Sequence, residues 1–415
     1  YSSVIPEIVP TAILKRQKLM GAREAIRELH FPENLEKVTE AQKKVAFEEM
    51  FLIQLNAIRA RRDWEQSKSI QVSFDEKLIK KFVASLPFKL TNAQKKSSFQ
   101  ILKDLEKNYP MNRLLEGDVG SGKTVVAAIA ALEAMMAGYQ TAILAPTEVL
   151  ARQHFETFGK VLKGFSQKIG LLTNSESRTF WKKNTKKNFL GKIKRGDIKI
   201  LIGTHALIQK SVEFNKLALV IIDEQHRFGV NQRAYLQKQT SSLKDGLKKS
   251  IPHLLSMTAT PIPRTLALAF FGNLDISLLD EMPKGRKKIV TKIITPSKRQ
   301  EIYNFIRAEV ESGRQAFFIF PLIEESEKIS GKAATEEHKN LSENIFPDLK
   351  IGLLHGRMKP KEKEKIMQDF KNKDLNILVS TSVIEVGVDV PNATIMVIEG
   401  SERFGLAQLH QFRGR

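Results

Sequence analysis

The run Gly117–Thr124, with the sequence GDVGSGKT, combines the residue types needed to bind the phosphates of a nucleotide. Glycines let the backbone wrap closely around an anion, so that successive N–H groups point inward. The Lys123 ammonium would bind the β- and γ-phosphates, and the Thr124 hydroxyl would bind Mg²⁺. A helix that begins near Lys123 would direct the positive end of its dipole at the same phosphates. The residues predicted to contact the nucleotide here are Gly117, Gly120, Ser121, Gly122, Lys123 and Thr124.

Two acidic residues, Asp223 and Glu224, follow an apolar run that starts at Leu217. In nucleotide hydrolases such a pair divides the work: Asp223 would bind Mg²⁺, and Glu224 would polarise the attacking water. Alone the pair is a weak signal, because a capped strand end has the same appearance. Its position about 100 residues after a phosphate-binding loop makes it a strong one.

Strands and helices that could position these residues alternate from about Pro87 onward, which predicts parallel sheets covered by helices. In a first lobe the predicted strands are 112–115, 141–146, 198–203, 217–223 and 253–258, and in a second lobe 315–321, 350–355, 376–381 and 394–399. A basic stretch at 280–289 indicates a linker between the lobes. The apolar residues of 40–63 are dense enough to predict a helix packed on two sides. We therefore expect a helical segment at 1–85, a nucleotide-binding lobe at 86–282 and a second α/β lobe at 283–415.

The composition favours a polyanionic partner. The 415 residues include 67 Lys+Arg against 46 Asp+Glu, a net charge of +21, and no cysteine, so neither a disulfide nor a thiolate metal site can form. Nucleic acid and an anionic membrane surface are the two partners that such a charge allows. Between Lys160 and Ile200, twelve Lys and Arg residues stand against two acidic residues. That stretch is interpreted either as an exposed basic insert or as a strand-binding segment.

With the run DEQH at 223–226, the phosphate loop resembles those of the superfamily-2 helicases and translocases, and further motifs follow in the order of that superfamily. The resemblance implies two tandem RecA-like lobes with ATP and Mg²⁺ between them. It implies that Gln94 reads the adenine edge, that Gly387 and Asp389 lie near the nucleotide, and that Arg413 and Arg415 face the γ-phosphate from the second lobe. The implied strand-contacting residues are Thr147, Arg152, Thr204, His205, His355, Gly356 and Thr381. The implied coupling residues are His226, Thr258, Thr260 and Gln411.

Longer strings, among them APTEVLARQHF at 145–155, VIIDEQHRFGVNQR at 220–233 and GLLHGRMKP at 352–360, are similar to the RecG family. The helical segment also resembles the segment ahead of the RecG motor. This resemblance implies a monomeric, ATP-dependent DNA helicase of the bacterial cytoplasm and nucleoid, without a membrane partner. Its expected substrates are branched DNA structures, namely forks for regression and Holliday junctions for branch migration. The run QLHQFRGR at 408–415 resembles the opening of motif VI, the last helicase motif. The wedge domain that precedes the motor in this family, and the continuation after motif VI, do not lie within 1–415, so we expect a fragment.

Three alternatives stay open on the sequence. The motor of the transcription–repair coupling factor shares several of these strings, although DEQH and the helical segment favour RecG. The second alternative is an RNA helicase, which would contain the same kind of two-lobe motor. A nucleic-acid-binding module with a vestigial ATP site is disfavoured because Lys123, Thr124, Asp223 and Glu224 all occur together.

Overall fold

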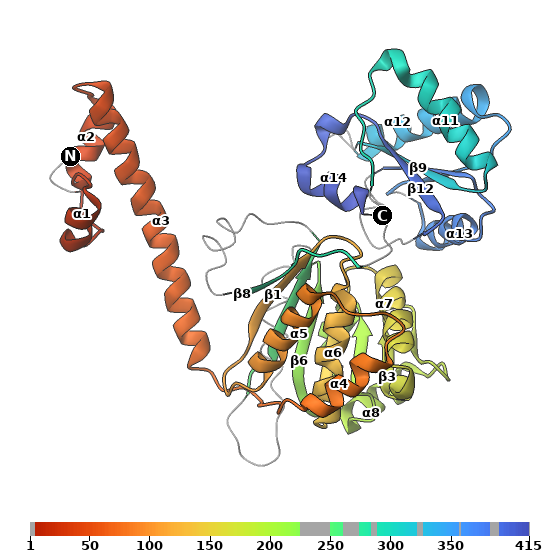
Figure 1. Cartoon of the computed structure of the whole chain (residues 1–415), viewed down its shortest axis with the longest axis horizontal. Helices are drawn as coiled ribbons and strands as arrows, with labels where there is room; N and C mark the ends of the chain where they lie inside the picture. Colours follow the sequence, from red (N-terminus) through yellow and green to blue (C-terminus); the bar gives the residue numbers. More distant parts are fainter. Residues whose placement is uncertain are drawn as a thin grey trace.

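A computed structural model of the chain describes residues 5–224, 250–259, 274–283, 289–321, 327–356, 358–381 and 390–414. It consists of a helical N-terminal segment followed by two α/β lobes (Figure 1). Among the described residues, no helix combines the length and apolar character needed to cross a membrane.

The N-terminal segment contains helices α1 (Thr11–Gln17), α2 (Ala22–His30) and α3 (Leu35–Glu65). The Asn34 side chain caps α3 by accepting a hydrogen bond from the backbone N–H of Lys37. The predicted helix at 40–63 is confirmed, but the prediction that it packs on two sides is wrong. Helix α3 extends away from the lobes with Met50 and Ile58 exposed, because α2 is the only described helix that packs along it (Figure 1).

The first lobe contains an eight-stranded sheet in the order β4–β3–β5–β2–β6–β7–β1–β8, parallel except for the β3–β4 pair. Its strands are β1 (Asn112–Gly117), β2 (Gln140–Leu144), β3 (Ile169–Leu172), β4 (Ser177–Thr179), β5 (Ile200–Gly203), β6 (Leu217–Asp223), β7 (His253–Thr258) and β8 (Asp275–Leu279). Its helices are α4 (Glu76–Ser85), α5 (Asn92–Leu105), α6 (Lys123–Met136), α7 (Glu148–Val161) and α8 (Lys186–Arg195), with 3₁₀ turns at Lys163–Lys168 and His205–Ile208.

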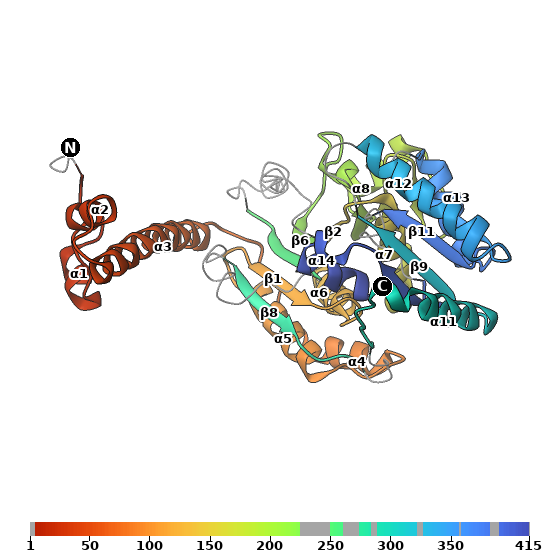
Figure 2. The same ribbon diagram turned by 90° about the horizontal axis from the view of Figure 1, so that it is seen from above.

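Both faces of this sheet are apolar and covered, as expected for parallel strands. Along β6, Leu219 and Ile221 pack in a core with α5, α6 and α7, whereas Val220 and Ile222 pack in a second core with α8. Figure 2 shows β6, β1 and β8 beside α5 and α6.

The segment before α5 belongs to this lobe. Ile70 and Val72, together with Ile79 of α4, are buried in the same core as α5 and α6. The expected boundary at residue 85 is therefore placed too late, because 70–85 packs with the first lobe and not with α1–α3.

The second lobe contains a four-stranded parallel sheet in the order β10–β11–β9–β12. Its strands are β9 (Gln315–Phe320), β10 (Ile351–Leu354), β11 (Ile377–Thr381) and β12 (Ala393–Ile398), and its helices are α11 (Arg299–Glu311), α12 (Glu327–Asn340), α13 (Pro360–Lys371) and α14 (Leu406–Arg413). Short helical turns occur at Pro296–Lys298, Leu341–Ile345 and Ser401–Arg403. Phe318 faces a core with α11, and Phe317 faces the opposite core with Phe370 and Phe412.

All nine predicted strands are present, with ends that differ by at most two residues. Strands β3, β4 and β8 were not predicted. The basic stretch at 160–200 is not an insert, because Ile169 and Leu172 of β3 and Phe189 of α8 are buried in the lobe. Its lysines are exposed or half-buried. The stretch supplies β3 and β4 at one edge of the first sheet.

Candidate nucleotide site and strand-binding face

The phosphate loop connects the end of β1 to the start of α6 and depends on glycine at two positions. Gly122, which caps α6, has φ +90°, and a Cβ there would lie 2.3 Å from the Gln94 amide nitrogen. A Cβ at Gly117 would lie 2.6 Å from the Ser121 hydroxyl. Larger residues would therefore disrupt the loop as well as strain it. The sequence prediction of a strand–loop–helix arrangement here is confirmed.

Lys123 holds its charge within this loop. Its Nζ donates hydrogen bonds to the carbonyl oxygens of Gly117 at 2.6 Å and Asp118 at 3.0 Å. The ammonium therefore lies at the start of α6, where the helix dipole is also positive. The positive charge of Lys123 and the positive end of the α6 dipole therefore favour phosphate binding at the same place.

Gln94 lies against the loop and not in an open cleft. Its Nε2 donates to the Ser121 carbonyl at 2.7 Å, and its Oε1 accepts from the Thr91 N–H at 2.9 Å as part of a capping box. Only 2% of the residue is exposed. The predicted contact with an adenine edge would therefore require this side chain to move.

Asp223 and Glu224 lie at the end of β6, which is buried along its whole length. The Asp223 Oδ2 atom is 2.7 Å from Nε2 of His154, a buried residue of α7. Burial raises the pKa of the Asp223 carboxyl, but the hydrogen bond and electrostatic interaction with His154, together with the charge of Lys123, outweigh it and hold the pKa below its ordinary value. The Asp223 carboxylate therefore interacts with the charge of Lys123 in the phosphate loop.

Glu224 adopts a left-handed backbone with φ 51° and is buried. For a residue other than glycine, such a conformation costs about 1–3 kcal/mol, and this kind of strain gathers at functional sites. This left-handed residue lies directly after Asp223 at the end of β6.

His154 is a site residue that the sequence did not predict. It belongs to the run ARQHF, but no local spacing relates it to Asp223, which lies 69 positions away. Only the packing of α7 beside β6 brings the imidazole to the carboxylate.

The predicted metal ligands are of a type that suits Mg²⁺. Asp223 and Thr124 offer hard oxygen atoms, the donors that this ion prefers. Magnesium typically takes one or two protein oxygens and completes its shell with phosphate and water, so this sparse set fits the ion.

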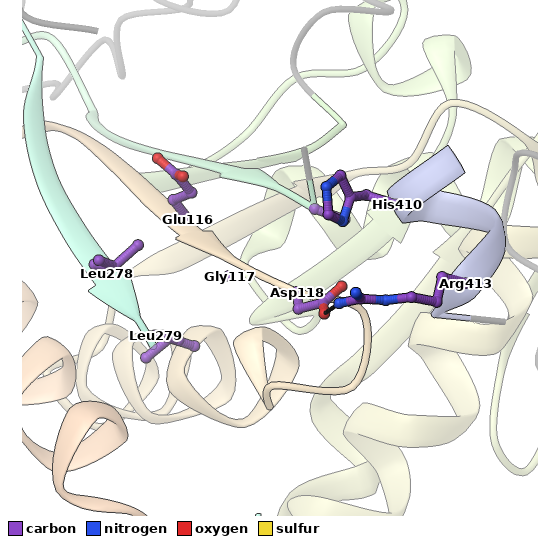
Figure 3. Close-up of a pocket in the computed structure, with 8 residues that line it drawn as sticks. Glu116, Gly117, Asp118, Leu278, Leu279, His410 and Arg413 are labelled. Carbon is purple, nitrogen blue, oxygen red and sulfur yellow. Dashed lines mark hydrogen bonds and ion pairs between the residues drawn. The ribbon is translucent and has the colours of Figure 1, made fainter. Parts of the chain in front are cut away.

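The second lobe reaches the phosphate loop through α14. Arg413 lies 3.1 Å from the Asp118 carboxylate, and both side chains line a cavity of about 190 Å³ with His410 (Figure 3). A Cβ on Gly414 would lie 2.4 Å from the Val119 side chain, so α14 ends directly against the loop. The cavity is smaller than the roughly 300–1,000 Å³ of ordinary ligand pockets, so a nucleotide would have to widen it.

The residues predicted to contact a nucleic acid strand follow the carboxyl ends of strands in both sheets. Thr147 caps α7 after β2, and Thr204 is buried after β5. His355 and Gly356 follow β10, and Thr381 is buried at the end of β11. His205 begins the 3₁₀ turn after Thr204 and is exposed. The parallel topology thus brings the predicted residues of each lobe to the carboxyl-terminal ends of the strands in that lobe. Thr204 and Thr381 are buried there and offer little side-chain surface to a nucleic acid strand.

Arg152, also on α7, is engaged by acidic side chains. Its guanidinium pairs with Glu176 at 3.1 Å and with Glu364 of α13 in the second lobe. The predicted strand contact is thus a contact between the lobes in this structure.

Thr258 and Gln411, predicted to couple the two activities, are buried at the end of β7 and on α14. Five predicted site residues lie outside the described residues: His226, Thr260, Gly387, Asp389 and Arg415.

Comparison with known proteins identifies the class to which this site belongs. The family described as DEAD/DEAH box helicase matches residues 91–269, and the helicase conserved C-terminal domain matches 297–415. The two matches coincide with the two lobes, which are the tandem RecA-like lobes of a superfamily-2 helicase.

Within this class the similarity is to RecG. The chain is 50% identical over 98% of its length to an ATP-dependent DNA helicase RecG from Synechocystis sp., covering 47% of that protein, and 47% identical over 99% to the RecG of Aquifex aeolicus, covering 51%. A structure of RecG bound to a three-way DNA junction matches with a TM-score of 0.83 and 43% identity, over 100% of this chain and 53% of that one. The chain therefore belongs to the RecG family, and it spans about half the length of these relatives.

Proposed function

We propose that this chain is the ATP-driven motor of a RecG-type DNA helicase, which translocates on DNA and remodels branched structures such as forks and Holliday junctions. The observation that carries the proposal is the convergence of three groups on one cleft between the lobes. Lys123 lies in the phosphate loop, the Asp223 carboxylate at the end of β6 interacts with the charge of Lys123, and Arg413 reaches the loop from the opposite lobe. A known structure of RecG with a three-way DNA junction supports the choice of branched DNA.

Each group would have its own part in hydrolysis. Lys123 would bind the β- and γ-phosphates, while Asp223 and Thr124 would hold Mg²⁺, which neutralises phosphate charge when bound. Glu224, at the end of the same strand, would accept the proton of the attacking water. Arg413 would stabilise the charge that develops on the γ-phosphate, a role worth about 10³-fold or more in rate.

Translocation would follow from the presence of predicted strand-contacting residues on both lobes. Thr147 and Arg152 lie on the first lobe, whereas His355 and Thr381 lie on the second. If nucleotide binding and release change the position of Arg413 relative to the phosphate loop, the two sets of strand contacts move relative to one another once in each cycle. Contacts with the backbone position a protein without reading sequence, so we expect a preference for structure and not for sequence.

The test is phosphate release by the full chain with and without DNA, using Lys123→Ala as the matched inactive control. We expect DNA-stimulated turnover in the wild-type chain and none in the variant. Stimulation by a three-way DNA junction, by blunt duplex DNA and by duplex RNA should fall in that order. A better response to RNA would select the RNA-helicase alternative, and absence of turnover with every substrate would select the module with a vestigial site.

Salt dependence provides a second test. Each phosphate contact by Lys or Arg contributes about −0.9 to the slope of log affinity against log salt concentration on duplex DNA. We expect a steep slope and nearly equal affinities for unrelated sequences of equal length. A flat response would contradict a motor that grips the backbone. We further propose that the motor acts as a monomer, which sedimentation with and without DNA would test.

A further inference from the structure

A short hairpin at the edge of the first sheet presents an exposed tryptophan among lysines. We define this basic hairpin as residues 177–187, which begin with β4 and run into α8. Trp181 lies at its turn and is 79% exposed. Its lysines are all exposed; they are Lys182, Lys183, Lys186 and Lys187. No role in the nucleotide site or in the lobe interior accounts for this combination.

The hairpin is held in a defined shape. The Thr179 N–H donates to the Lys182 carbonyl at 3.0 Å, which closes the two-residue turn Phe180–Trp181, and the Asn184 N–H donates to the Ser177 carbonyl at 2.9 Å. The Ser177 hydroxyl donates to the Asn184 carbonyl at 2.7 Å. These bonds fix the direction in which the turn projects.

Phe180 anchors this turn to the lobe. Its ring stacks on Phe155 of α7 with 4.0 Å between centroids and 9° between planes, and the Arg178 guanidinium lies over Phe155 as well. The two adjacent aromatic residues therefore have opposite environments: Phe180 packs on α7, and Trp181 is exposed to solvent. A side chain presented on a fixed turn loses little conformational entropy when it binds a partner.

The position of the hairpin relates it to the strand-binding face. Glu176, the residue before the hairpin, pairs with both Arg152 and Arg178, and Ser175 also contacts Arg152. Arg152 is a predicted strand contact. The basic hairpin thus continues the face on which the strand is expected, and its lysines extend the positive charge outward.

We propose that Trp181 stacks on an unpaired base of single-stranded DNA while the lysines of the basic hairpin bind the neighbouring phosphates. A protein partner is disfavoured because lysine is depleted at protein interfaces, whereas a basic groove with an aromatic platform is the usual single-strand site. The choice of DNA rests on the proposed function. The stacking itself makes no use of the base sequence, since every base has a π-face.

The chain offers a direct probe of this contact, because it contains two tryptophans. The other, Trp64, lies on α3 and donates its indole N–H to the Pro110 carbonyl at 2.8 Å. In a Trp64→Phe chain, Trp181 is the sole tryptophan. Titration with oligo(dT) should then quench its emission to saturation, in step with binding measured separately by the anisotropy of labelled DNA. Binding without quenching would overturn the proposal, as would equal quenching by blunt duplex DNA or by anionic vesicles.

Affinity measurements complete the test. Base stacking on an aromatic ring contributes about 1–3 kcal/mol per base, so Trp181→Ala should weaken oligo(dT) binding about tenfold, with Trp181→Phe intermediate and Trp64→Phe unchanged. Replacing Lys182 or Lys183 by Gln should each reduce the salt slope by about 0.7 on single strands. Equal affinity of Trp181→Ala and the wild-type chain would refute the stacking. None of these measurements requires hydrolysis, so their outcome is independent of whether DNA-stimulated turnover is found.

Discussion

His253, at the start of β7, should make the stability of the first lobe depend on pH. Its side chain is fully buried, its Nδ1 accepts a hydrogen bond from the Met111 N–H at 2.9 Å, and its Nε2 donates to the Ile70 carbonyl at 2.6 Å. Because Nδ1 acts as an acceptor, protonation would place two donors against one another. Burial lowers the pKa of His253 from 6.5 to about 4.

The sign and size of the effect follow from linkage. Below pH 6.5 the unfolded chain takes up a proton at this position, whereas the folded chain does not until about pH 4. The contribution of the neutral imidazole to stability is therefore complete above pH 6.5 and is lost as the pH falls to about 4. A pKa difference of about 2.5, at about 1.4 kcal/mol for each unit, corresponds to about 3 kcal/mol, of which about 2 kcal/mol is lost between pH 7.5 and 5.

The assay compares urea unfolding of the wild-type chain and His253→Gln at pH 7.5 and pH 5. Glutamine can also donate to Ile70 and accept from Met111, but it does not titrate. Emission of Trp64 in a Trp181→Phe background reports the relevant region, since Trp64 bonds to Pro110 beside Met111. We expect the stability deficit of the Gln variant to shrink by about 2 kcal/mol from pH 7.5 to pH 5. Parallel losses in both chains would show that His253 does not titrate as argued.

The remaining predictions concern the cleft. Lys123→Ala should abolish ATP turnover, because the nucleotide phosphates lose the positive charge that binds them. DNA affinity measured by anisotropy should stay within a few-fold of the wild-type value. Glu224→Gln should bind nucleotide normally and release phosphate about 10²-fold more slowly or worse, since the amide cannot accept a proton. His154→Phe should raise several-fold the Mg²⁺ concentration for half-maximal nucleotide binding, because Asp223 loses its buried donor, and His154→Gln should restore part of it. Arg413→Ala should lower kcat by about 10³-fold, with a smaller change in nucleotide affinity measured by equilibrium titration.

Much of the fold could be predicted because long apolar runs and the phosphate loop are strong local signals. Runs such as Leu217–Asp223, buried along their whole length, belong to parallel sheets and have no competing interpretation of similar strength. The missed strands are short or mixed in character: β3 has four residues, β4 has three, and β8 contains polar Asp275 and Ser277. Strand β8 forms by pairing with β1, far earlier in the chain, whereas β3 pairs with β5 and β4 pairs with the neighbouring β3.

The chemistry of the site could be predicted from its residue types, but the contacts between its side chains could not. The loop spacing fixes where Lys123 lies, and the strand end fixes where Asp223 lies. Nothing in the spacing pairs His154 with Asp223, or Gln94 with the Ser121 carbonyl, because each pair is brought together by packing between elements. The predicted role of Gln94 at an adenine edge stays a prediction.

The two arginines expected to bind phosphate share one feature that connects structure to function. Arg413 pairs with Asp118 and Arg152 with Glu364, and each pair joins an arginine on one lobe to a carboxylate on the other. A carboxylate offers arginine the same fork of oxygen acceptors as a phosphate, so phosphates that bind as predicted would compete with Asp118 and Glu364 for these guanidinium groups. All four side chains are partly exposed, and such ion pairs contribute only about 0–1 kcal/mol each. We therefore expect a nucleotide phosphate to displace Asp118 and a DNA phosphate to displace Glu364 at little cost, and the loss of both pairs to let the lobes move relative to one another.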